Sequence, residues 1–114
     1  MTDTICNLSS GRVCKPCEGG VPAMSLQEEQ TAMKRLPLWT LGESKISRRW
    51  VFANHYQAIA FVNAVAWVSH RENHHPLMEV GFKDVKIIYW THAVNGLSEN
   101  DFICADMLDR LAVP

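Results

Sequence analysis

A long apolar segment, flanked on each side by a pair of strand-like segments, constrains the fold more than any other feature. Residues 54–70 repeat apolar side chains at helical spacing, and Asn54 stands in position for an N-cap. The strand-like segments are residues 38–41, 46–52, 77–82 and 85–91. Within each pair the connection is short and polar, which is typical of a hairpin. The sequence therefore predicts an antiparallel sheet.

Two capping boxes predict one helix before this core pattern and one after it. Ser25 and Glu28 form the first box, and the helix that they start is expected to end near Leu36, before Pro37. Ser98 and Asp101 are spaced in the same way after the Asn95-Gly96 turn, and that helix is expected over residues 99–111. The element order is then α-β-β-α-β-β-α. We predict an α+β, two-layer architecture, with a four-stranded antiparallel sheet and three helices on one face.

Length and composition limit the possible classes of protein. The chain has 114 residues, 47% of them hydrophobic, which suits a single domain; we predict a flexible arm over residues 1–23 and the domain over 24–114. A net charge of −1 argues against a nucleic-acid partner. No apolar run is long enough to span a bilayer, and the N-terminus does not resemble a signal peptide. A cytoplasmic location without membrane contact is expected.

The arm contains a CxxC motif of unassigned role. Cys14 and Cys17 form it, with Cys6 nearby and Cys104 far along the chain. Such a motif binds zinc or takes part in redox chemistry when a second ligand pair or a thioredoxin-like context is present. Neither is evident, so reduced thiols in a flexible arm are the simpler interpretation.

The most informative chemical feature is a cluster of histidines. Four of the five histidines, His70, His74, His75 and His92, fall within 23 consecutive residues. Imidazole exchanges protons near neutral pH, which makes such a cluster typical of a proton-transfer or a metal site. Zinc held by His70, His74 and His92 is one possibility, although no HExxH pattern is present.

Proton transfer on a flat heteroaromatic ligand is the other possibility. His74 and His75 are adjacent, so their rings diverge, and His92 is expected on the same sheet face as Trp90. The indole would stack on the ligand while imidazoles exchange protons, an effect that is typically worth about 10²–10⁴ in rate. Asp101 could orient one imidazole and favour its charged form.

The spacing of the cluster resembles the signature of a known family. His70-x3-His74-His75-Pro76-x5-Phe82-x9-His92-x8-Asp101 is similar to that of the pterin-4a-carbinolamine dehydratases, and the similarity covers about residues 24–111. The resemblance implies a lyase without cofactor or metal. It would dehydrate 4a-hydroxy-tetrahydropterin to quinonoid dihydropterin, and thereby recycle the pterin of aromatic amino acid hydroxylases.

The resemblance also implies roles for individual residues. His74 and His92 would be the acid/base pair, and His75 would mainly position the pterin, so these three form the catalytic set. The residues implied in substrate binding are His70, Asn73, Pro76, Trp90, Thr91 and Asp101. The first position of the signature is often acidic in animal members, so His70 is a binding candidate rather than a catalytic one.

An alternative function would use the surface of the central helix. Residues 59–68 carry more apolar surface than one sheet-facing stripe needs, which predicts a homodimer, a homotetramer or a well-buried helix. Some relatives act as dimerisation cofactors of a transcription factor, and a non-catalytic relative could assist the assembly of another enzyme. The complete histidine set favours catalysis.

Overall fold

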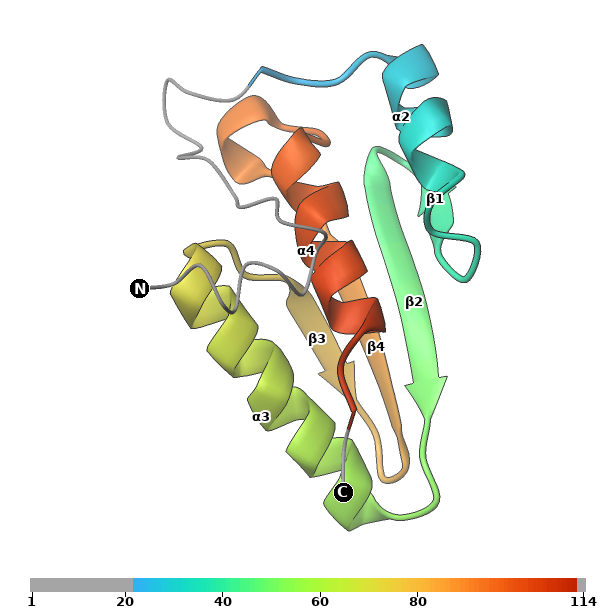
Figure 1. The fold of residues 1–114 in the computed structure, drawn as a ribbon, viewed down its shortest axis with the longest axis vertical. Helices are drawn as coiled ribbons and strands as arrows, with labels where there is room; N and C mark the ends of the chain where they lie inside the picture. The colour runs from blue at the N-terminus through green and yellow to red at the C-terminus, as the bar shows by residue number, and fades with distance from the viewer. Residues whose placement is uncertain (1–21, 113–114) are drawn as a thin grey trace.

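Three α-helices and a four-stranded antiparallel sheet account for the regular structure of residues 22–112, the part that the computed structural model describes, apart from one short 3₁₀ turn (Figure 1). The helices are α2 (Leu26–Met33), α3 (His55–Glu72) and α4 (Glu99–Asp109), the strands are β1 (Thr40–Gly42), β2 (Lys45–Val51), β3 (Leu77–Val80) and β4 (Asp84–Tyr89), and the 3₁₀ turn is η2 (His92–Val94). The predicted fold class and element order are confirmed. Cys6, Cys14 and Cys17, with most of the predicted arm, lie outside the described residues.

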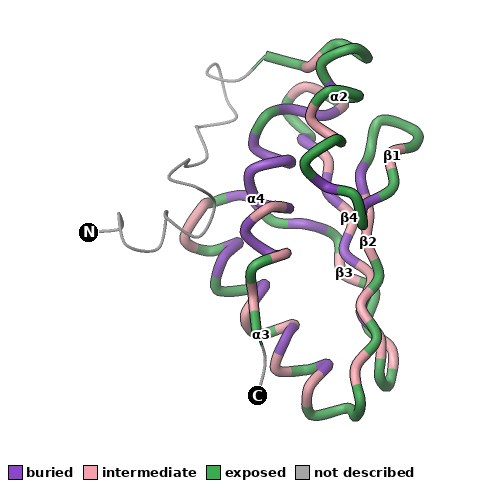
Figure 2. The backbone as a smooth tube through the Cα atoms, turned by 45° about the vertical axis from the view of Figure 1, so that its right-hand side comes forward, coloured by how far each residue is buried: buried purple, intermediate pink, exposed green. Residues whose placement is uncertain are grey.

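The sheet has the strand order β1-β2-β4-β3, and every neighbouring pair is antiparallel. Along β4, Val85, Ile87 and Tyr89 are fully buried, whereas the alternate Lys86 and Ile88 are only half-buried. This period of two places one face of the sheet against the helices and leaves the other face open. The helix α4 lies over the covered face and is the most buried helix (Figure 2).

Helix α3 divides its apolar side chains between the core and the surface. Asn54 caps its first turn by accepting a hydrogen bond from the Gln57 backbone N–H, as predicted. The side chains that pack into the core are Ala58, Phe61, Val65 and Val68. Tyr56 and Trp67 remain 68% and 54% exposed. None of the helices in the described part of the chain combines the length and the apolar character needed to cross a membrane.

Two predicted boundaries were wrong in an informative way. Helix α2 ends at Met33, not near Leu36, because the next backbone N–H groups bond three residues back and tighten the chain: Leu36 N–H donates to Met33 at 2.9 Å. This tighter path directs Leu36 into the core. The β1–β2 connection is also shorter than predicted. Glu43 and Ser44 form it, and both have a left-handed backbone with φ of 54° and 58°.

Candidate functional site

The candidate site lies where four elements begin or end at one end of the sheet. The C-terminus of α3, the start of β3, the end of β4 and the start of α4 meet there (Figure 1). Asn73 ends α3 in the left-handed region, with φ of 54°, and the next backbone N–H, that of His74, donates back to Ser69 at 3.1 Å. This is a helix C-cap in which asparagine takes the place usually held by glycine. The cap turns the chain sharply and directs the two following histidines away from the helix.

An open hollow of about 400 Å³ occupies this end of the sheet. Its lining residues come from the α3–β3 turn and from the segment that follows β4: Asn73, His74, His75, Trp90, Thr91, His92 and Ala93. All three residues predicted as catalytic therefore line one hollow, together with three of those predicted to bind substrate. Long-range folding creates this grouping, because the two segments are separated by the whole β3–β4 hairpin.

His74 is the buried imidazole of the site. Its side chain is 7% exposed, and its ring stacks on Tyr89 with a centroid distance of 5.6 Å and an angle of 6°. Its Nε2 lies 2.7 Å from Oδ1 of Asp101, which is completely buried. This hydrogen bond joins Asp101 to one imidazole of the cluster, which is the contact that the expected orienting role requires. Because an ionised carboxylate only accepts hydrogen bonds, Nε2 carries the proton in this arrangement.

The second oxygen of the Asp101 carboxylate is also fully engaged. Oδ2 accepts hydrogen bonds from Thr91 Oγ1 at 2.8 Å and from the Ser98 backbone N–H at 2.9 Å. Thr91 Oγ1 and Ser98 Oγ are themselves 2.7 Å apart. Thr91 is 1% exposed and Ser98 is 0% exposed, so the network is screened from water. The sequence predicted Ser98 only as a helix cap. The capping-box spacing of Ser98 and Asp101 was the one sequence signal that linked Ser98 to this carboxylate.

The other two imidazoles are exposed at the surface of the hollow. His92 lies in η2 and not at a strand end as predicted, because the chain leaves the sheet after Tyr89 and forms the 3₁₀ turn. It still contacts Trp90, with ring centroids 4.7 Å apart at 52°. Lys45 Nζ lies 4.8 Å from the same indole, a cation–π contact. No sequence signal pointed to Lys45, because it comes from the distant β1–β2 hairpin.

Three residues of the predicted set do not line the hollow. His70 is exposed on α3 and packs beside Trp67, with ring centroids 6.0 Å apart. Pro76 is buried in the turn between α3 and β3. Asp101 is connected to the hollow through two lining residues to which it is hydrogen-bonded, His74 and Thr91.

The signature residue Phe82 lies at the opposite end of the sheet. It is 71% exposed and stacks on His55, the first residue of α3, with ring centroids 5.2 Å apart at an angle of 6°. The contact therefore joins the tip of the β3–β4 hairpin to the start of α3. Phe82 is part of the sequence signature without being part of the hollow.

The zinc interpretation finds no support in the geometry. Among residues 22–112, no group of three or more His, Cys, Asp or Glu side chains is arranged to hold a metal ion. His70 does not line the hollow that His74 and His92 share, so the three histidines do not form one zinc site in this arrangement.

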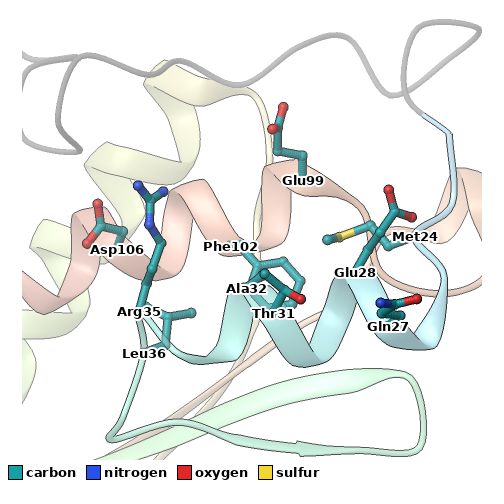
Figure 3. A pocket seen from close by; sticks show the side chains of 10 residues that line it. All are labelled: Met24, Gln27, Glu28, Thr31, Ala32, Arg35, Leu36, Glu99, Phe102 and Asp106. Carbon is teal, nitrogen blue, oxygen red and sulfur yellow. The ribbon is translucent and has the colours of Figure 1, made fainter.

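A larger hollow of about 470 Å³ lies between α2 and α4 (Figure 3). Its lining is an apolar floor with a charged rim: Met24, Gln27, Glu28, Thr31, Ala32, Arg35, Leu36, Glu99, Phe102 and Asp106. It contains no histidine or cysteine and no buried acid–base pair. The smaller hollow is therefore the candidate site, because it has the histidines that the larger hollow lacks.

Comparison with known proteins assigns this chain to a family. The model of the family described as "Pterin 4 alpha carbinolamine dehydratase" matches residues 22–111. A protein of Dechloromonas aromatica (strain RCB) is 56% identical over 108 residues, which cover 95% of this chain and 96% of that protein. A protein of Nitrosomonas europaea is 55% identical over 108 residues, covering 94% of this chain and 95% of its own. Both carry the name pterin-4-alpha-carbinolamine dehydratase as a provisional assignment.

Two solved structures are similar to the fold. A transcriptional coactivator/pterin dehydratase from Brucella melitensis superposes with a TM-score of 0.73 at 24% identity, over 76% of this chain and 95% of that one. A pterin dehydratase-like protein, described as a RuBisCO assembly factor in the alpha-carboxysome, gives a TM-score of 0.53 at 27% identity, over 62% of this chain and 84% of that one. The fold is thus shared by proteins with different described roles.

Proposed function

Because the chain belongs to the pterin 4 alpha carbinolamine dehydratase family, we propose that it dehydrates 4a-hydroxy-tetrahydropterin to quinonoid dihydropterin and water. One observation carries this proposal: an imidazole that is hydrogen-bonded to a buried carboxylate lines the same hollow as two further imidazoles and an indole. Loss of water from the substrate needs both a proton donor and a proton acceptor beside a planar ring. The hollow offers both from side chains alone.

The reaction divides into two proton transfers. The C4a–O bond breaks with its electron pair leaving on oxygen, and a general acid protonates that oxygen so that it departs as water. A general base removes the proton from N5, and the N5–H electron pair becomes part of the new C4a=N5 double bond. The proton gained by the base and the proton lost by the acid balance, so solvent restores both groups and no redox change occurs.

We assign the base to His74 and the acid to His92. A base that accepts a proton becomes an imidazolium, and the Asp101 carboxylate 2.7 Å from His74 Nε2 stabilises that charge. His92 is exposed, so solvent can reprotonate it after each turnover. It also contacts Trp90, the indole on which we propose that the pterin stacks.

Two further residues of the hollow, His75 and Asn73, would bind and orient the pterin. His75 and Asn73 are exposed beside His74 and supply polar contacts. Pro76 would act indirectly, by restricting the turn that carries both histidines. The natural source of the substrate would be an aromatic amino acid hydroxylase, since such enzymes produce 4a-hydroxy-tetrahydropterin.

A dehydratase assay tests the proposal directly. Purified protein is expected to accelerate the decay of synthetic 4a-hydroxy-tetrahydropterin, followed by the absorbance of the quinonoid product, with equal rates before and after treatment with a chelator. An unchanged rate of decay would contradict the enzymatic function. Activity that the chelator removes and zinc restores would instead support a metal-dependent site.

The exposed face of α3 supports a second function, in which this protein binds another copy of itself or a different protein. Tyr56, Ile59 and Trp67 lie along one side of the helix and are 68%, 36% and 54% exposed. An unpartnered apolar face of this kind is typical of a protein–protein interface. We infer self-association as a homodimer or homotetramer through this face, or assembly of another protein. Analytical ultracentrifugation of the Trp67→Lys variant tests self-association: it is expected to sediment as a smaller species than the wild type.

A further inference from the structure

We propose that Thr91 and Ser98 are positioning residues that act through Asp101 and His74, and that the Thr91 hydroxyl is not a substrate contact. The proposal rests on the dehydratase function proposed above and adds two residues to its machinery. It also changes the role of Thr91, which the family resemblance implied among the substrate-binding residues.

The direction of the hydrogen bonds follows from the number of donors. Thr91 Oγ1 donates its single hydroxyl proton to Asp101 Oδ2 at 2.8 Å. In its 2.7 Å contact with Ser98 Oγ, Thr91 must therefore be the acceptor and Ser98 the donor. The protons thus run in one direction, from Ser98 through Thr91 to the carboxylate. Because the Thr91 hydroxyl donates its only proton to the carboxylate, it cannot donate a hydrogen bond to a ligand in the hollow.

This series of hydrogen bonds fixes the orientation of the Asp101 carboxylate. Oδ2 is held from two directions, by the Thr91 hydroxyl and by the Ser98 backbone N–H, which leaves Oδ1 directed at His74 Nε2. Rotation of the carboxylate would break two hydrogen bonds in a region where no member of the network is more than 7% exposed. Hydrogen bonds in such a low-dielectric environment are costly to lose. The imidazole is therefore held in one tautomer and one orientation.

A kinetic comparison distinguishes positioning from substrate contact. Thr91→Val keeps the shape of the side chain and removes its hydroxyl, so kcat is expected to fall about tenfold with KM nearly unchanged. Thr91→Ser is expected to restore most of kcat. Ser98→Ala, which leaves the backbone N–H in place, is expected to lower kcat less than Thr91→Val. Thr40→Val, the same chemical change on exposed β1, serves as the matched control and is expected to leave both parameters unchanged.

A double-mutant cycle tests the route through His74. In a His74→Ala background, Thr91→Val is expected to have no further effect on kcat, because the group on which the hydroxyl acts is gone. An equal tenfold loss in that background would overturn the proposal. So would a Thr91→Val variant that raises KM while kcat stays the same.

A spectroscopic measurement keeps the test independent of turnover. In ¹⁵N-labelled wild-type protein, His74 is expected to show a protonated Nε2 with a downfield proton resonance, and Thr91→Val is expected to weaken or abolish that resonance. An unchanged His74 resonance in the folded variant would refute the network. If the wild type has no dehydratase activity, the proposed function fails, and this arm still decides whether Thr91 and Ser98 orient His74.

Discussion

Helices α2 and α4 begin with the same local motif, yet only one of the two motifs joins the candidate site. In α2 the Ser25 backbone N–H donates to Glu28 Oε1 at 2.8 Å, and the Glu28 N–H donates to Ser25 Oγ at 3.2 Å. Both residues are exposed, and their hydrogen bonds serve the first turn of the helix. The motif in α2 is therefore explained by helix stability alone.

In α4 the carboxylate of the motif is buried and makes additional bonds. Asp101 still accepts a hydrogen bond from the Ser98 backbone N–H, at 2.9 Å, but it also accepts from Thr91 and His74. The difference shows that a capping carboxylate has acceptor capacity beyond its helix. Where burial excludes water, this capacity is filled by side chains, and a helix cap becomes part of the hydrogen-bond network of the candidate site.

The largest expected effect comes from removing the imidazole that the buried carboxylate orients. His74→Ala is expected to lower kcat about 10²–10⁴-fold, the usual contribution of a general acid or base. His55 provides the matched control, because its ring also stacks on an aromatic side chain and also makes a 2.7 Å hydrogen bond, to the exposed carbonyl of Phe82. His55→Ala is expected to retain full kcat in the dehydratase assay. Equal losses in the two variants would remove the distinction between the two histidines.

The next effect concerns the charge of the α4 motif. Asp101→Asn keeps the size of the side chain but removes the counter-charge of His74, and we expect kcat to fall about 100-fold. Because the group is buried and accepts three hydrogen bonds, the free energy of unfolding is expected to fall by about 2–3 kcal/mol. Urea unfolding and the activity assay measure both quantities. Asp84→Asn affects an exposed ion pair with Arg49. It is expected to lower the free energy of unfolding by less than about 1 kcal/mol and to leave the activity unchanged.

A smaller effect is expected from the exposed motif. Ser25→Ala removes the acceptor of the Glu28 backbone N–H and is expected to lower the free energy of unfolding by about 1 kcal/mol, with kcat and KM unchanged. Thermal unfolding and the activity assay together check this separation. A loss of activity in this variant would mean that α2 and the candidate site are coupled.

The smallest expected effect is a dependence on pH. The backbone and side-chain hydrogen bonds from Ser25 hold the pKa of Glu28 below its ordinary value of 4.5. A lowered pKa in the folded state means that the ionised carboxylate contributes stability above pH 4.5, and that this contribution is lost as the pH falls through the folded pKa. Glu28→Gln is therefore expected to be slightly less stable than the wild type at pH 7. Unfolding curves at pH 7 and at pH 3 should show the two proteins converging in acid.

Much of the fold was predictable because its signals are local. The helix starts at Ser25, Asn54 and Ser98 were recognised from capping residues, and the strands were recognised from alternation and short polar turns. The predicted end of α2 was wrong, because the tight turn after Met33 depends on Leu36 packing into a core that only the folded chain provides. His92 was expected at a strand end for a similar reason: the departure of the chain into η2 has no strong local signal.

The candidate site was predictable only in part. The residues His74, His75 and His92 were recognised by their density and spacing, and all three line one hollow. His70 belongs to the same cluster in sequence, but it is exposed and does not line the hollow. Helix α3 ends at the Asn73 cap, so His74 lies beyond the helix and does not share the helix face of His70. Spacing along the chain thus identified the candidate histidines, but it did not show which of them line the same hollow.

Local patterns specified the elements, their order and the histidines that are candidates for acid–base chemistry, since capping, alternation and residue type act over a few neighbouring residues. Tertiary structure alone decided which groups cooperate. It buried Asp101 beneath His74, joined Thr91 to Ser98, and brought Lys45 over Trp90 from a distant hairpin. These contacts depend on burial and on the meeting of remote segments, which no short stretch of sequence encodes. The same serine–carboxylate motif is therefore a simple cap in α2 and part of a histidine network in α4.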